Sequence, residues 1–170
     1  MSAETPFAAR LARARALIAQ DSGAGPPTSL RDQVEAATRD VDRVRGDAAQ
    51  VLRTVFPHRG WQEKTLSSTA DEACAYVLAA ILDCARFTCE HLRQEGPQPA
   101  FAQLPLRRLV CRRCIPIMPM PPLEEADRCD MCGERGVTWF VPLQVARGPV
   151  LVLGDVCPAC ARALGIETAA

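Results

Sequence analysis

The arrangement of cysteines constrains this chain more than any other feature. The 170 residues contain nine cysteines, and six of these form three C-x-x-C pairs within fifty residues. The pairs are Cys111/Cys114, Cys129/Cys132 and Cys157/Cys160. Two residues between cysteines let both thiolates turn toward one ion, and two such pairs supply the four tetrahedral ligands that zinc accepts. An odd total, with no apolar signal sequence at the start, argues against a disulfide framework, so the pairs predict bound zinc.

Composition sets the size and class of the fold. Apolar residues make up 48% of the chain and charged residues 24%, which is enough apolar surface to bury a core. Twenty basic and twenty acidic side chains cancel, so any contact with nucleic acid requires a local patch. No run approaches the roughly 18–20 consecutive apolar residues that span a bilayer. We therefore expect a cytoplasmic protein of one or two small domains without a membrane partner.

The N-terminal part of the chain predicts helices. Residues 1–20 form an amphipathic segment with apolar residues spaced by four and three, and residues 21–29, which hold two glycines and two prolines, predict a linker. In residues 30–55 the apolar positions repeat with the 4-3 spacing of a coiled-coil seam. This long helix is therefore expected to mediate self-association or to dock a protein partner.

A second long helix is expected from residue 68 to about residue 94. Thr69 and Glu72 match a capping box, and residues 75–82 are apolar on every side, as in a helix buried by several neighbours. Residues 30–95 would then form a helical hairpin or bundle in which this helix contacts the heptad helix. The remaining cysteines, Cys74, Cys84 and Cys89, share no helical face at ligand spacing, so we interpret them as small core residues.

The C-terminal part differs in character. Three prolines in residues 96–106 predict a second linker, and residues 107–170 predict a zinc-binding module. Residues 137–141 and 150–153 read as two strands of a hairpin joined through residues 147–149. Cys157 then leads into a short helix, with Pro158 in a first-turn position that tolerates proline. The expected fold class is α+β, with a helical region followed by a small cysteine-rich module.

A knuckle, a hairpin and a cysteine pair on the first turn of a helix together resemble treble-clef zinc fingers. The resemblance covers residues 128 to about 166, and includes Gly133 directly after the second knuckle cysteine. It implies that four cysteines hold one structural zinc ion: Cys129, Cys132, Cys157 and Cys160. Treble-clef proteins include binders of DNA, RNA and protein, so the resemblance constrains the function only weakly.

The role of Cys111 and Cys114 stays open between several arrangements. Fourteen residues separate Cys114 from Cys129, which also suits a zinc ribbon built from the first two pairs. The upstream pair is otherwise free, or binds a second zinc with residues such as Cys89 and His91, or shares thiolates in a two-zinc cluster. We favour one zinc site. An all-thiolate shell leaves no open position, which favours a structural role over catalysis.

Four arginines lie within seven residues around the first pair: Arg107, Arg108, Arg112 and Arg113. Such a cluster near a zinc knuckle predicts contacts with phosphates, and Trp139 offers a ring for stacking on bases. Residues 107–170 nevertheless carry a net charge of only +1, as expected for an ordinary solvated surface. The hypothesis is an intracellular zinc-stabilised regulatory or accessory protein that recognises nucleic acid or a nucleic-acid-processing partner. The alternative is a protein-protein adaptor with a purely structural zinc module.

Overall fold

The structure is a computed structural model that describes residues 6–20, 28–55, 70–117, 119 and 126–166. Residues 21–27 of the first expected linker, the cap at Thr69 and His58 lie outside these ranges. Within the described ranges, no helix combines the length and the apolarity needed to cross a bilayer.

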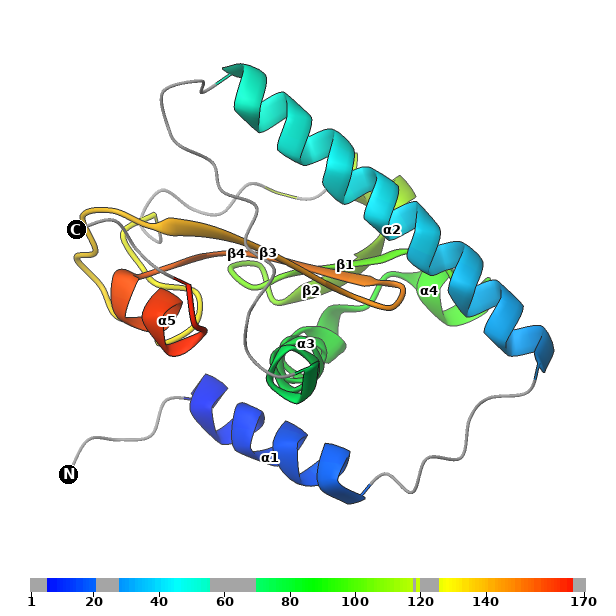
Figure 1. Cartoon of the computed structure of the whole chain (residues 1–170), viewed down its shortest axis with the longest axis horizontal. Helices are drawn as coiled ribbons and strands as arrows, with labels where there is room; N and C mark the ends of the chain where they lie inside the picture. The colour runs from blue at the N-terminus through cyan, green and yellow to red at the C-terminus, as the bar shows by residue number, and fades with distance from the viewer. Residues whose placement is uncertain (1–5, 21–27, 56–69, 118, 120–125, 167–170) are drawn as a thin grey trace.

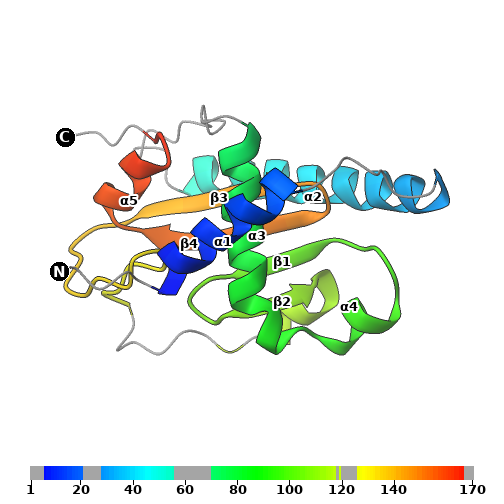
Figure 2. The same cartoon turned by 90° about the horizontal axis from the view of Figure 1, so that it is seen from below.

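The elements form three layers around one sheet (Figures 1 and 2). Helices α1 (Pro6–Gln20) and α3 (Ala70–Cys84) lie on one face of the sheet, and α2 (Thr28–Val55) crosses the other face. The four strands are β1 (Ala100–Gln103), β2 (Arg108–Cys111), β3 (Val141–Arg147) and β4 (Val150–Val156). This arrangement confirms the α+β fold class.

The sheet has the order β2-β1-β4-β3 and joins two hairpins. Within each hairpin the strands are antiparallel, and β1 pairs with β4 in parallel, with Phe101 opposite Leu151. The predicted C-terminal hairpin is confirmed, but its first strand begins at Val141 and not at Val137. Strand β1 lies inside residues 96–106, which the prolines predict as a linker. Only pairing with two other strands makes this segment a strand.

One core fills the space between α1, α3 and the sheet. Tyr76 and Ala80 are fully buried there, and the ring of Phe7 lies 5.6 Å from the ring of Tyr76. The same core contains Val145 and Val152 from the C-terminal hairpin. The apolar centre of the predicted helix is therefore buried as expected, in a core that draws residues from both sides of segment 96–106.

Helix α2 packs on the opposite face and not against α3, which corrects the predicted pairing of the two helices. Val41 is 0% exposed and belongs to a cluster with Phe101, Val110 and Leu151 of the sheet. Ala37, one heptad position earlier, is also buried. The apolar seam of α2 thus contacts the strands of its own chain over these positions.

The second predicted helix is interrupted. Helix α3 ends at Cys84, a 3-10 turn η1 (Ala85–Phe87) follows, and the chain is extended at Thr88 before the short helix α4 (Glu90–Gln94). Thr88 forms a β-bridge with Leu109 of β2. This pairing overrides the local helix preference, because it adds backbone bonds to a neighbouring strand. It also brings the start of α4 to the end of β2.

Candidate metal centres

The first candidate centre, here called centre A, consists of Cys129, Cys132, Cys157 and Cys160. Their four Sγ atoms all lie within 4.8 Å of one another, and Cys132 Sγ lies 3.8 Å from Cys157 Sγ. A tetrahedron of sulfurs, each about 2.3 Å from a zinc ion, has edges of about 3.8 Å. The donor set and its spacing therefore fit a tetrahedral metal ion.

The backbone shapes centre A from both sides. At the knuckle, the Gly133 N–H donates to the Cys129 carbonyl at 2.9 Å, and Gly133 has φ +75°, which a side chain would strain. On the other side, Cys157 ends β4 and caps the short helix α5 (Pro158–Ala163), whose first turn carries Cys160. The Cys157 N–H donates to Cys129 Sγ at 3.2 Å and so ties the two halves together.

Hydrogen bonding favours the charged form of a ligand in centre A. Donation from the Cys160 thiol and from backbone N–H groups lowers the pKa of Cys129 to about 4, in spite of burial. In contrast, burial raises the pKa of Cys84 to about 12, and this thiol contacts only the Gln103 carbonyl, at 3.7 Å. Cys84 is thus an inert core residue, as expected, whereas Cys129 has the surroundings of a thiolate ligand.

The second candidate centre, centre B, consists of Cys89, His91, Cys111 and Cys114. The four ligand atoms again lie within 4.8 Å of one another, and Cys114 Sγ lies 3.3 Å from His91 Nδ1. The Cys111 N–H donates to Cys89 Sγ at 3.2 Å, as Cys157 does to Cys129 in centre A. A shell of three cysteines and one histidine is an established zinc donor set.

The two centres share one plan with the chain order reversed. In centre A a knuckle precedes the β3–β4 hairpin and a short helix follows it; in centre B the short helix α4 precedes the β1–β2 hairpin and a knuckle follows. In both, a cysteine in extended conformation caps the helix, Cys157 with φ −68° and Cys89 with φ −66°. Each outer hairpin of the sheet is therefore closed by one four-ligand cluster.

Of the arrangements open to the third pair, the structure brings together the one with Cys89 and His91. Cys111 and Cys114 do not join the Cys129/Cys132 knuckle as a zinc ribbon would require. Two interpretations are therefore corrected: Cys89 is not a core residue, and His91 is not a simple surface or cap residue. The C-x-H spacing of Cys89 and His91 was the available signal, and its distance from Cys111 in the sequence concealed it.

The arginines predicted to bind phosphate do not form one patch. Arg107 precedes β2 and Arg112 follows it, so the two are about 16 Å apart along an extended chain. Arg112 and Arg113 begin the 3-10 helix η2 (Arg112–Ile117), and Arg113 pairs with Glu95 at 3.1 Å. Trp139 is 47% exposed and lies between the knuckle of centre A and β3.

Comparison with models of protein families, with curated proteins and with solved structures gave no match. The likeness of residues 128–166 to a treble clef therefore rests on the knuckle, the hairpin and α5 themselves.

The ligand set of centre B predicts a change in metal stoichiometry. His91→Ala should lower the zinc content from two ions to one per chain, because three thiols leave the tetrahedral shell open to solvent. His91→Cys should keep both ions, since four thiolates also satisfy zinc. Metal analysis after purification under reducing conditions measures both variants. A wild-type content of one ion, unchanged in His91→Ala, would contradict the assignment of centre B.

Proposed function

We propose that centres A and B each bind a structural zinc ion. The supporting observation is that each cluster supplies four sulfur or nitrogen donors at tetrahedral spacing, without a carboxylate. A shell filled by four protein ligands leaves no position for substrate water, which favours a structural over a catalytic role. Cobalt substitution tests this: tetrahedral thiolate spectra are expected, whereas iron with charge-transfer colour would contradict the proposal.

Zinc at these positions suits a small protein with a thin core. The core layers consist largely of alanine, valine and cysteine, with Tyr76 and Phe101 as the largest fully buried side chains. Such a core supplies limited hydrophobic stabilisation, and small domains commonly add metal ions to compensate. Each proposed ion would hold a short helix to the end of an outer hairpin.

We further propose that the zinc-stabilised fold recognises nucleic acid, as the treble-clef resemblance suggests. Support comes from Arg112 and Arg113 on η2, directly beside the ligands of centre B, and from the exposed ring of Trp139 near centre A. Guanidinium groups bind phosphates in a bidentate manner, and an exposed indole stacks on bases. Glu95 holds Arg113 at 3.1 and 3.3 Å, so this pair would have to open on binding.

The ion pair makes the nucleic-acid proposal testable. Replacing Arg112 and Arg113 with glutamine should weaken binding to a single-stranded oligonucleotide and lower the log-log salt slope by about 2, because each lost phosphate contact removes roughly 0.9. Glu95→Gln is the matched opposite variant: it frees Arg113 and should strengthen binding. Fluorescence anisotropy across a salt series measures both. Equal affinity of all three proteins would contradict the proposal.

A protein-protein adaptor is the second candidate, favoured by one observation. Ile117 is 78% exposed at the end of η2, beside centre B. An isoleucine so exposed next to a rigid metal cluster suits contact with an apolar surface of a partner. Lack of oligonucleotide binding at low salt, with zinc bound and the fold intact, would favour this candidate.

A further inference from the structure

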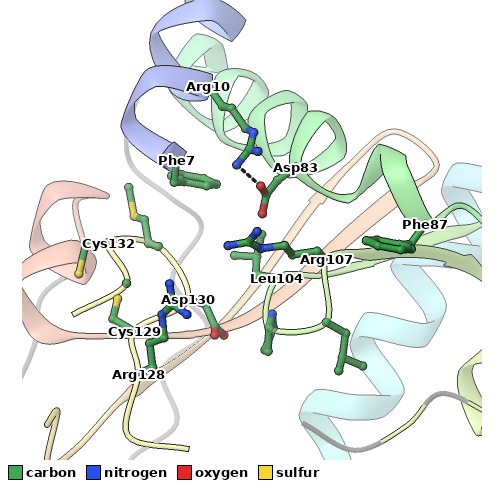
Figure 3. A pocket seen from close by; sticks show the side chains of 14 residues that line it. Phe7, Arg10, Asp83, Phe87, Leu104, Arg107, Arg128, Cys129, Asp130 and Cys132 are labelled. Atoms are coloured by element: carbon green, nitrogen blue, oxygen red, sulfur yellow. Dashed lines mark ion pairs between the residues drawn. The ribbon is translucent and has the colours of Figure 1, made fainter. Parts of the chain in front are cut away.

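A hollow of about 430 Å³ lies between α1, the turn that joins β1 to β2, and the knuckle of centre A (Figure 3). Three arginines from these three elements line it: Arg10, Arg107 and Arg128. In Figure 3 the side chains of Arg107 and Arg128 extend into the same space from opposite walls. The volume is in the range of small-molecule sites in proteins.

The acidic groups of the hollow already have partners. Asp83 pairs with Arg10, and its side chain is only 9% exposed. Asp130 accepts a hydrogen bond from the Asp155 N–H at 2.6 Å and lies against Gly154. Within the part of the chain that the structure describes, no hydrogen bond or ion pair engages the guanidinium group of Arg107 or Arg128. Their donors are therefore available to a bound anion.

The backbone at Arg107 is an independent sign of function. Arg107 has φ +48°, and it is the one non-glycine residue with positive φ among those described. Its N–H donates to the Leu104 carbonyl at 3.2 Å and closes the β1–β2 turn. Glycine is the residue that normally occupies this conformation, and strain of this kind is concentrated at binding and catalytic sites. An arginine here gives the hollow a guanidinium group at the expense of the turn.

Apolar side chains form the rest of the wall. Phe7 and Leu104 line the hollow from the core side, and Phe87, which is 54% exposed, stands at its rim. A ring with so much free surface can stack on a flat group of a ligand. The hollow thus pairs an anion-binding end with an apolar, partly aromatic wall.

We propose that this hollow binds the terminal phosphate of a nucleotide between Arg107 and Arg128, with the base against Phe87. Guanidinium groups match phosphate oxygens with two parallel hydrogen bonds, which an ammonium group does not. The site is separate from Arg112 and Arg113, so it goes beyond the nucleic-acid surface proposed above. A free mononucleotide and the phosphorylated end of a strand present the same chemistry to it.

Calorimetric titration of the zinc-loaded full chain with adenosine 5′-monophosphate and with adenosine tests the proposal. The phosphate should improve affinity by about tenfold or more, the gain from one or two charge-assisted hydrogen bonds. Arg128→Gln should remove this gain, whereas Arg147→Gln, an exposed arginine on β3 outside the hollow, should keep it. Equal binding of the two ligands, or an unchanged affinity in Arg128→Gln, would overturn the proposal.

Arg107→Gly separates binding from folding. Glycine relieves the positive φ, so this variant should unfold at a higher denaturant concentration than the wild type while it loses the preference for the phosphate. A variant that is more stable yet binds more weakly excludes misfolding as the cause. If Arg107→Gly kept the full phosphate preference, the proposal would be wrong.

The source of the phosphate follows from a second pair of ligands. A short oligonucleotide with a 5′-phosphate should bind more tightly than its 5′-hydroxyl form if the site takes strand ends. Equal binding of both forms, together with phosphate-dependent binding of the mononucleotide, would assign the site to free nucleotides. Failure of the Arg112 and Arg113 experiment leaves these measurements unaffected, so the two proposals fail separately.

Discussion

Cys157→Ser should unfold the β3–β4 hairpin and α5 at room temperature. Cys157 is 3% exposed and belongs to the four ligands of centre A, and a serine hydroxyl does not replace a zinc thiolate. Structural zinc contributes about 10–16 kcal/mol in small zinc domains, which is comparable to the whole stability of a typical protein of about 5–15 kcal/mol. Loss of zinc from the purified protein and loss of dispersed backbone NMR signals from residues 126–166 are the expected results.

Cys84→Ser is the matched control for this experiment. Cys84 is equally buried but lies outside both clusters, and a serine hydroxyl can donate to the Gln103 carbonyl that the thiol contacts. This variant should keep its full zinc content. A folded, zinc-replete Cys157→Ser protein would show that centre A does not stabilise the hairpin.

The same variant tests the predicted domain boundary at residues 96–106. Tyr76 of α3 and Val145 of β3 share one core, so we expect helical circular dichroism to fall together with the hairpin signals. If the helical signal survived in full, residues 30–95 would form a domain of their own, as the proline pattern predicts.

Val41→Glu should destabilise the protein by about 4 kcal/mol at pH 7. Val41 is 0% exposed against Phe101 and Leu151, so a carboxyl group there is excluded from water and is neutral in the folded state. The figure is the cost of keeping a proton at pH 7 on a group whose ordinary pKa is about 4.3. Loss of the valine methyl contacts adds to it. The midpoint of urea unfolding measures the effect.

The expected pH dependence of this variant has a definite sign. Burial raises the folded-state pKa of the new carboxyl above its unfolded value, so the folded state binds more protons and the added destabilisation grows as pH rises from about 4.3. Lowering the pH from 7 to 5.5 should therefore reduce the difference from the wild type. Ala36→Glu, on the exposed face of the same helix, should change stability little at either pH. Similar midpoints for both variants would mean that the seam of α2 does not contact the sheet.

Regular patterns in the sequence predicted much of the secondary structure. The 4-3 spacing of residues 30–55 and the apolar centre at 75–82 correspond to α2 and α3, because a helix that buries one side or all sides must show this periodicity. The C-terminal hairpin and α5 follow from strand composition and from Pro158. Segment 100–103 was missed because four residues carry too little periodicity to outweigh the neighbouring prolines.

The sequence by itself determined the composition of each knuckle. Ligands two residues apart in C-x-x-C pairs turn toward one ion through local backbone geometry, so Cys129/Cys132 and Cys157/Cys160 were recognisable as metal-binding pairs without a structure. The hairpin between them spans few residues, and this made their association predictable as well.

Only the tertiary structure decided how the third pair is completed and which faces the helices cover. Cys89 and His91 reach Cys111 and Cys114 because Thr88 pairs with Leu109, a contact between segments about twenty residues apart that breaks a helix favoured locally. Likewise, an apolar seam states that a helix face is buried but not against what, and α2 covers the sheet because β1 and β4 pair in parallel beneath it. Such pairings depend on the free energy of the whole fold, which no local pattern encodes.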